Sequence, residues 1–86
     1  MNFYSLIDMN FTVYSKDGCP YCEMIKQIFV GKDLQFIEYK LDQNFTKQQF
    51  YDEFGEGATF PQITLDGEKL GGCTDTVQHL REQKVI

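Results

Sequence analysis

The chain has 86 residues and a mass of about 10.1 kDa, which suits one small domain over residues 1–86 and leaves no room for a second. Hydrophobic residues make up 42% of it and charged residues 24%, a balance that excludes disordered, collagen-like and coiled-coil proteins. Its net charge of −5 provides no basic footprint for nucleic acid or an anionic membrane. No apolar run approaches the ~20 residues of a membrane helix. We therefore expect no nucleic acid and no membrane among its partners.

The first residues and the cysteines indicate the compartment. Residues 1–10 have no basic segment and no continuous apolar stretch, because Asp8 interrupts them, so we expect no signal peptide. The cysteines, Cys19, Cys22 and Cys73, are odd in number, which argues against a disulfide framework and for a reducing cytoplasm. The apolar side chains near the start are expected to cover an apolar surface patch: Phe3, Tyr4, Leu6 and Ile7.

The first half of the chain predicts a strand, a helix and a second strand. Residues 11–14 are β-branched and aromatic and end at a Lys-Asp-Gly loop signal. Pro20 suits the first position of a helix, because its missing N–H has no partner there, and apolar residues then recur at helical spacing as far as Gly31. Apolar and charged residues alternate over 35–41, which predicts the second strand.

The next helix has a clear local code. Thr46 at the N-cap with Gln49 three residues later predicts a capping box, and Phe45 with Phe50 predicts a hydrophobic staple. Phe50 and Phe54 are one turn apart, so with Tyr51 they are expected to form core. Gly55 and Gly57 end this helix.

The last third predicts a hairpin and a final helix. Residues 62–65 and 68–70 flank Asp66-Gly67, a favoured two-residue hairpin turn. Gly71-Gly72 is expected to break the strand, and Thr74 or Asp75 to cap the helix that carries Val77 and Leu80. The order β-α-β-α-β-β-α predicts an α/β fold with a four-stranded mixed sheet and three helices. Its first two strands should be parallel and its last two antiparallel.

Cys19 and Cys22 carry the chemistry. Cys19 falls at the mouth of a helix, where free N–H groups and the dipole favour a thiolate, and Lys16 adds positive charge. Together these should place the pKa of Cys19 within the ~3.5–7.5 range of such sites, against ~8.5 for a free cysteine. Cys22 lies one turn further into the helix on the same face, so we expect it to be less exposed and to act as the resolving thiol. The pair opens a helix after a strand, which favours redox chemistry. Inert thiols, or a zinc site that also uses Cys73 and His79, are the alternatives.

Three blocks in order and spacing resemble the dithiol glutaredoxins: residues 16–22, which contain Cys-Pro-Tyr-Cys, then Thr59-Phe60-Pro61, then residues 71–75. The resemblance covers nearly the whole chain. Thioredoxins share the fold but usually carry Trp-Cys-Gly-Pro-Cys, and this chain has no Trp. The resemblance implies a single glutaredoxin domain with a thioredoxin-like fold.

The resemblance also implies a glutathione site. It implies a cis peptide bond before Pro61 and backbone pairing of Phe60 with a bound peptide. Phe60 stands where Val is commoner and is expected to narrow the groove, and Thr74 stands where Asp or Ser is commoner. The α-helix N-terminus at Thr74 and Asp75 would hold a carboxylate. Plainer structural roles compete: Thr74 and Asp75 as caps, Cys73 as a half-buried apolar residue, Lys16 and Gln48 as surface residues, and Tyr21 as a residue packed against the protein. The implied glutathione-binding residues are Lys16, Tyr21, Gln48, Thr59, Phe60, Pro61, Gly72, Cys73, Thr74 and Asp75.

The function implied is glutathione-dependent reduction of protein disulfides and protein–glutathione mixed disulfides. Cys19 would attack, and Cys22 would resolve a mixed disulfide with a protein. Glutathione is the co-substrate and no metal is expected. Clients would be disulfide-bonded or glutathionylated proteins, ribonucleotide reductase being a usual one, and the protein should be a monomer. The alternative is a carrier in which two protomers and two glutathiones hold an iron–sulfur cluster through Cys19, although Pro20 directly after the cysteine disfavours it.

Overall fold

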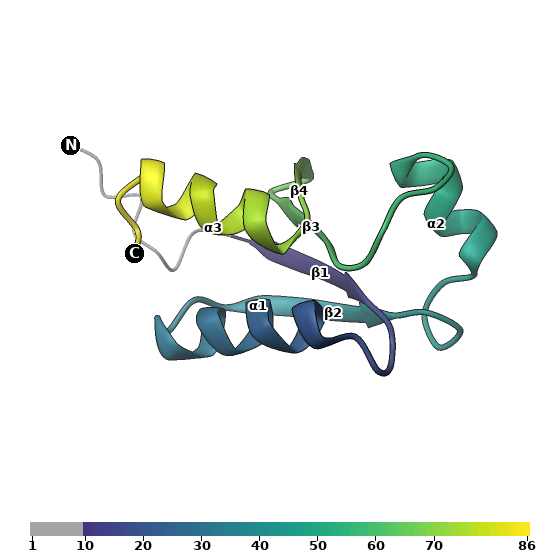
Figure 1. The fold of residues 1–86 in the computed structure, drawn as a ribbon, viewed down its shortest axis with the longest axis horizontal. Helices are drawn as coiled ribbons and strands as arrows, with labels where there is room; N and C mark the ends of the chain where they lie inside the picture. Colours follow the sequence, from purple (N-terminus) through teal and green to yellow (C-terminus); the bar gives the residue numbers. More distant parts are fainter. Residues whose placement is uncertain (1–9) are drawn as a thin grey trace.

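The computed structural model describes residues 10–86, so the expectations for residues 1–9, including the apolar patch of Phe3, Tyr4, Leu6 and Ile7, lie outside the described residues. The order of elements confirms the order predicted from the sequence (Figure 1). The elements are β1 (Phe11–Ser15), α1 (Pro20–Gly31), β2 (Phe36–Lys40), α2 (Lys47–Phe54), β3 (Gln62–Leu65), β4 (Glu68–Gly71) and α3 (Cys73–Glu82).

The four strands form one mixed sheet in the order β2-β1-β3-β4. β1 runs parallel to β2, with Phe11 opposite Phe36, as the helical crossover between them requires. β3 is antiparallel to both β1 and β4. The predicted parallel pair and the predicted hairpin are therefore both confirmed.

One face of the sheet carries the core beneath α1 and α3. Alternate residues of β1 point to this face, and Phe11, Val13 and Ser15 are at most 1% exposed. Phe29 of α1 packs against Phe11 with the rings tilted by 31° and their centroids 4.7 Å apart, and Leu80 of α3 is buried in the same cluster. Fully burying each such side chain contributes about 1.5–3 kcal/mol. The core thus fixes α1 and α3 side by side, with both helices beginning at the same end of the sheet (Figure 1).

α2 lies beyond the ends of β1 and β2 (Figure 1). Its capping box is confirmed, since the Gln49 N–H donates to Thr46 Oγ1 and the Thr46 N–H donates to Gln49 Oε1. The predicted staple is also present, because the rings of Phe45 and Phe50 stack at 5.7 Å. Phe54 packs edge-on against Tyr14 of β1 at 5.0 Å, so aromatic rings join α2 to the sheet.

The hairpin turn is confirmed, but the start of α3 differs from the prediction. Asp66 and Gly67 have φ angles of +52° and +86°, as the favoured hairpin turn requires. Gly71 still belongs to β4, and Gly72, not Thr74 or Asp75, is the N-cap of α3. Gly72 is extended, so the helix begins as soon as β4 ends. Asp75 supports it from inside the first turn, because its Oδ2 accepts from the Gly72 N–H at 3.4 Å.

Candidate active site

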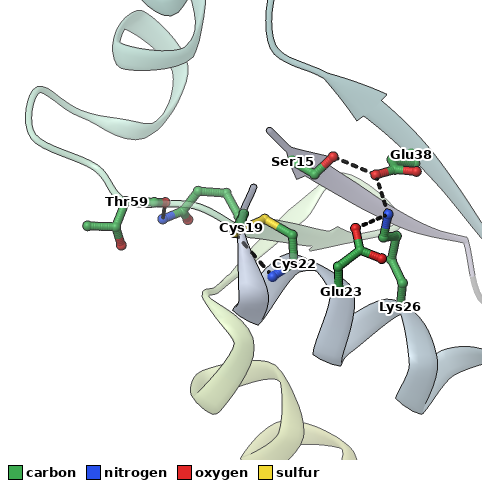
Figure 2. Close-up of a disulfide and its surroundings, with 8 residues drawn as sticks. Ser15, Cys19, Cys22, Glu23, Lys26, Glu38 and Thr59 are labelled. Atoms are coloured by element: carbon green, nitrogen blue, oxygen red, sulfur yellow. Dashed lines mark hydrogen bonds and ion pairs between the residues drawn. A yellow bond between two sulfur atoms is a disulfide. The ribbon is translucent and has the colours of Figure 1, made fainter. Parts of the chain in front are cut away.

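Cys19 and Cys22 lie at the start of α1, joined in a disulfide with their Cα atoms 5.2 Å apart (Figure 2). Cys19 is the N-cap and Pro20 follows it in the first turn, as predicted. The Cys22 N–H donates to Cys19 Sγ at 3.2 Å, a contact of the kind that stabilises a thiolate at a helix N-terminus. Cys19 is 6% exposed and Cys22 is fully buried. The geometry therefore makes Cys19 the more accessible sulfur.

The loop before Cys19 turns the chain from β1 into α1. Gly18 has a φ of +71°, a left-handed conformation that glycine adopts at little cost. Asp17 pairs with Lys40 at the end of β2 at 2.9 Å, and this bond and its charge raise the pKa of Lys40. The Asp17 side chain is 82% exposed and that of Lys40 is 33% exposed, so solvent screens the pair and it holds the loop only weakly.

A polar cluster made of Ser15, Glu23, Lys26 and Glu38 lies on the side of the disulfide away from Thr59 (Figure 2). Glu38 accepts from Ser15 Oγ at 2.6 Å and from Lys26 Nζ at 2.8 Å, and Lys26 also contacts Glu23 at 2.9 Å. Burial raises the pKa of Glu38, but the bonds from Lys26 and Ser15 outweigh it and leave that pKa below its ordinary value. Burial lowers the pKa of Lys26, but the bonds to its two carboxylate partners raise it by more. The pKa of Lys26 therefore lies above its ordinary value. Glu38 and Lys26 thus both stay charged at neutral pH.

A groove of about 300 Å³ begins at Tyr21 and runs between the Pro61 loop and the start of α3; we call it the Pro61 groove. The peptide bond between Phe60 and Pro61 is cis, as the family resemblance implied. In α3 the first intrahelical bond is from the Thr76 N–H to Gly72 O, so earlier N–H groups remain available. Eight of the residues singled out from the sequence line this groove: Tyr21, Thr59, Phe60, Pro61, Gly72, Cys73, Thr74 and Asp75.

Lys16 and Gln48 do not line the Pro61 groove. Lys16 Nζ lies over the Phe60 ring, 5.3 Å from its centroid, and so contacts the groove wall. Gln48 lies on the exposed side of α2, where its amide donates to Asp52 Oδ1 at 2.8 Å. The structure thus brings Lys16 to the edge of the groove and leaves Gln48 bonded within its own helix.

The Phe60 ring is held by α2. It stacks on Phe50 with ring centroids 4.1 Å apart and an interplanar angle of 11°, and it lies 6.3 Å from Phe45. Phe50 is only 2% exposed, so this part of the aromatic cluster is core, as predicted. Much of the extra bulk of Phe60 is therefore taken up against α2.

The groove is also lined by two residues that the sequence analysis does not predict, Gly71 and Gln62. Gly71 has a φ of +108°, and a Cβ there would collide with the Asp75 carboxylate, so only glycine fits beside that side chain. The Gly-Gly pair was the available signal. Gln62 donates to the Thr59 carbonyl at 2.9 Å and so braces the Pro61 loop, and nothing in the sequence pattern distinguishes it from any polar strand residue.

The zinc alternative has no support in residues 10–86, where no three His, Cys, Asp or Glu side chains come together as metal ligands. Cys73 is buried, and this burial raises the pKa of its thiol, which therefore stays protonated at neutral pH. It lies in the wall of the Pro61 groove as a small, largely apolar residue.

Comparison with known proteins gives the family. The family model described as Glutaredoxin matches residues 11–70. The chain belongs to the glutaredoxin family. It is 35% identical over 66 residues to Glutaredoxin 3 of Escherichia coli (strain K12). The matched stretch covers 77% of this chain and 80% of that protein. The crystal structure of Glutaredoxin 1 from Francisella tularensis, complexed with cacodylate, matches with a TM-score of 0.74 and 31% identity over 90% of this chain and 96% of that one.

A glutaredoxin from buckwheat has the same fold, with a TM-score of 0.75, 24% identity and coverage of 93% of this chain and 76% of that one. The predicted thioredoxin-like α/β fold and the predicted redox-active cysteine pair are thus confirmed, and this glutaredoxin is a thiol–disulfide oxidoreductase. Within residues 10–86, none of the helices has the length and apolarity to cross a membrane.

Proposed function

We propose that this glutaredoxin uses glutathione to reduce protein disulfides and protein–glutathione mixed disulfides through Cys19 and Cys22. The observation that carries the proposal is the Pro61 groove, which begins at Tyr21, between the two cysteines in the chain, and ends at free N–H groups and an acidic side chain. Glutathione has two carboxylates and one ammonium group, so it needs this combination. The similar buckwheat structure is a complex with glutathione, which supports the same ligand here.

Each end of glutathione has a counterpart in this chain. The backbone N–H groups of Thr74 and Asp75 suit the γ-glutamyl carboxylate, and the Asp75 carboxylate suits its ammonium group. The backbone of Phe60 suits strand-like pairing with the cysteinyl residue. Lys16 suits the glycyl carboxylate. Gln48 can donate to the same carboxylate once its amide breaks the hydrogen bond to Asp52. The remaining groove residues, Tyr21, Thr59, Pro61, Gly72 and Cys73, supply walls.

The chemistry is a pair of thiol–disulfide exchanges. The Cys19 thiolate attacks the glutathione sulfur of a protein–glutathione disulfide; that S–S bond breaks, and the client leaves as a thiolate that takes a proton. A second glutathione thiolate attacks the Cys19–glutathione disulfide, which releases Cys19 and forms glutathione disulfide. With a protein disulfide, Cys22 loses its proton, attacks Cys19 and frees the client thiol. Two glutathione molecules then reduce the Cys19–Cys22 disulfide.

The test is reduction of the mixed disulfide of glutathione and mercaptoethanol, coupled to glutathione reductase and NADPH oxidation. Wild type should turn over, Cys19→Ser should be inactive and Cys22→Ser should retain activity. With a protein disulfide as substrate, Cys22→Ser should instead be trapped as a mixed disulfide with its client. Absence of turnover in wild type, or equal loss in both variants, would contradict the proposal.

The setting of this activity is part of the same proposal. Recycling by glutathione requires a reducing compartment, so we propose that the protein acts in the cytoplasm. We also propose that it acts as a monomer. Its clients are disulfide-bonded or glutathionylated proteins, with ribonucleotide reductase as the client that the family resemblance implies. Covalent trapping by Cys22→Ser in a cytoplasmic extract, followed by mass spectrometry, identifies them.

A further inference from the structure

A second groove of about 460 Å³ lies between α1 and α3; we call it the α1–α3 groove. Its walls are mainly apolar, with Met24 and Ile28 from α1 facing Val77 from α3. Tyr21 at its entrance is 58% exposed and Met24 is 47% exposed, which is high for large apolar side chains. Apolar side chains grouped along a groove indicate a binding surface more often than scattered ones do.

The α1–α3 groove continues the Pro61 groove, since the two share Tyr21, Cys73 and Thr74. Both helices begin at the dithiol end (Figure 1), so the groove leads away from Cys19 along their length. From Tyr21 to Ile28 the helix rises by about 10 Å, which an extended chain spans in about three residues. A polypeptide whose cysteine reacts at Cys19 can therefore place its next residues in this groove.

Arg81 lies at the far end of the groove and gives it a charge. Among residues 10–86, no carboxylate lies within ion-pair distance of its guanidinium, and no acidic side chain lines the groove. The chain has a net charge of −5, yet Arg81 stands beside apolar walls with no ion-pair partner among residues 10–86. The complementary ligand is an apolar segment that carries a carboxylate about three residues from its cysteine.

A second copy of the chain fits these features less well. A stable dimer buries about 800 Å² on each partner, which is far more surface than a strip between two helices provides. A copy seated on the groove would also cover Tyr21, at the entrance to the dithiol, and would block the reaction. A single extended client segment fills the groove and leaves Cys19 in reach of its disulfide.

We infer that the α1–α3 groove is a docking site for client polypeptides, which recognises apolar residues next to the reactive cysteine and a carboxylate that pairs with Arg81. This inference rests on the proposed function and deepens it, because it names a class of client sequence. Under the proposed function, glutathione occupies the Pro61 groove and leaves Met24, Val77 and Arg81 of the second groove free for the client.

The test compares glutathionylated peptides with a single central cysteine. The first has leucines beside the cysteine and a glutamate three residues away on each side, and the second has serines and glutamines at those places. A third keeps the leucines and has glutamine in place of both glutamates. For wild type we expect kcat/KM to be about tenfold higher for the first peptide than for the second, as burial of roughly two methylene groups would give. Comparison of the first peptide with the third measures the preference for glutamate, and comparison of the third with the second measures the preference for leucine.

Variants separate the apolar and the charged parts of the site. Met24→Ser should remove most of the preference for leucine, and Arg81→Gln only the preference for glutamate, which Arg81→Lys should keep. Val30→Ser is the matched control, since Val30 is 65% exposed on the same helix but outside the groove. All these variants should reduce the mercaptoethanol–glutathione disulfide as wild type does. Equal kcat/KM for the first two peptides in wild type, or equal losses in Met24→Ser and Val30→Ser, would overturn the inference.

A binding measurement keeps the two proposals distinguishable. The first peptide with serine in place of cysteine is titrated into the ¹⁵N-labelled protein. Shift changes at the amides of Met24 and Val77 support the docking site even if the small disulfide is not turned over, a result that would remove only the proposed function. Normal turnover of the small disulfide without shift changes in α1 or α3 would remove only the docking site.

Discussion

Replacing Glu38 by glutamine tests the polar cluster beside the dithiol. Glutamine keeps the size of the side chain but removes the charge that Lys26 faces. In the wild type one carboxylate oxygen, Oε2, accepts two bonds at 2.6 and 2.8 Å, from the fully buried Ser15 hydroxyl and from Lys26. The amide oxygen of glutamine can still face both donors, but without the negative charge that strengthens both bonds.

The expected cost follows from the charge that is lost. A hydrogen bond to a charged group contributes about 1.5–3 kcal/mol net, against about 0.5–1.5 kcal/mol for a neutral pair, and the substitution weakens two such bonds. The side chains of Glu38 and Lys26 are only 24% and 17% exposed, so solvent screens the pair little. Lys26 keeps its contact with Glu23, which is 62% exposed and compensates in part. We expect Glu38→Gln to lower the free energy of unfolding by about 2 kcal/mol at pH 7, and Tm by roughly 8–16 °C.

The effect should depend on pH in a defined direction. The folded-state pKa of Glu38 lies below its ordinary value of 4.5, so its contribution is present above pH 4.5 and is lost as pH falls through the folded-state pKa. The pKa of Lys26 lies above its ordinary value of 10.5, so its contribution is complete below pH 10.5 and is lost as pH rises through the folded-state pKa. The difference between wild type and Glu38→Gln should be constant between these limits and shrink in acid.

Thermal unfolding followed by circular dichroism across this pH range measures the difference. Asp17→Asn is the control, because it breaks an ion pair at a residue whose side chain is 82% exposed, and it should change Tm little. The reasoning is refuted if the two variants behave alike at neutral pH, or if the loss in Glu38→Gln persists undiminished in acid.

Three further substitutions have defined outcomes. Thr46→Ala removes the α2 capping box and should cost about 1 kcal/mol, seen as a lower midpoint of urea unfolding with an unchanged slope. Gly71→Ala should be more destabilising than Gly57→Ala, because both have positive φ angles but only at Gly71 does a Cβ meet another side chain; equal midpoints would contradict this packing. Thr76→Val should raise stability by about 1 kcal/mol, since within the described residues the fully buried Thr76 hydroxyl has no hydrogen-bond partner, and a fall in Tm would show that the hydroxyl is bonded.

Local codes explain what could be predicted from the sequence. The capping box of Thr46 and Gln49 and the Asp66-Gly67 turn each depend on residues within a few positions of one another, and both are present as expected. The active-site helix is likewise defined by Cys19 and its neighbours. Where a side chain and its backbone partner are adjacent in sequence, tertiary structure has little to change.

The misses depend on contacts between elements. Glycine has no side chain to mark it as an N-cap, so the sequence predicts the cap of α3 at Thr74 or Asp75, whereas the end of β4 sets it at Gly72. Gln48 lies away from the groove because of where α2 meets the sheet, which no periodicity reveals. The alternation in β2 identified a strand, yet the pairing of Glu38 with Lys26 arises only when α1 packs on the sheet.

Because the Phe60 ring packs on α2, substitutions in α2 can change the shape of the Pro61 groove without contacting a ligand. The ring touches Phe50 of α2 and the Lys16 ammonium group, while the residue's backbone borders the Pro61 groove. A larger or smaller residue at position 50 would therefore shift the groove wall although it contacts no ligand. Selection for a new substrate can act on such a distant position, and directed evolution of this protein should include α2 among its targets.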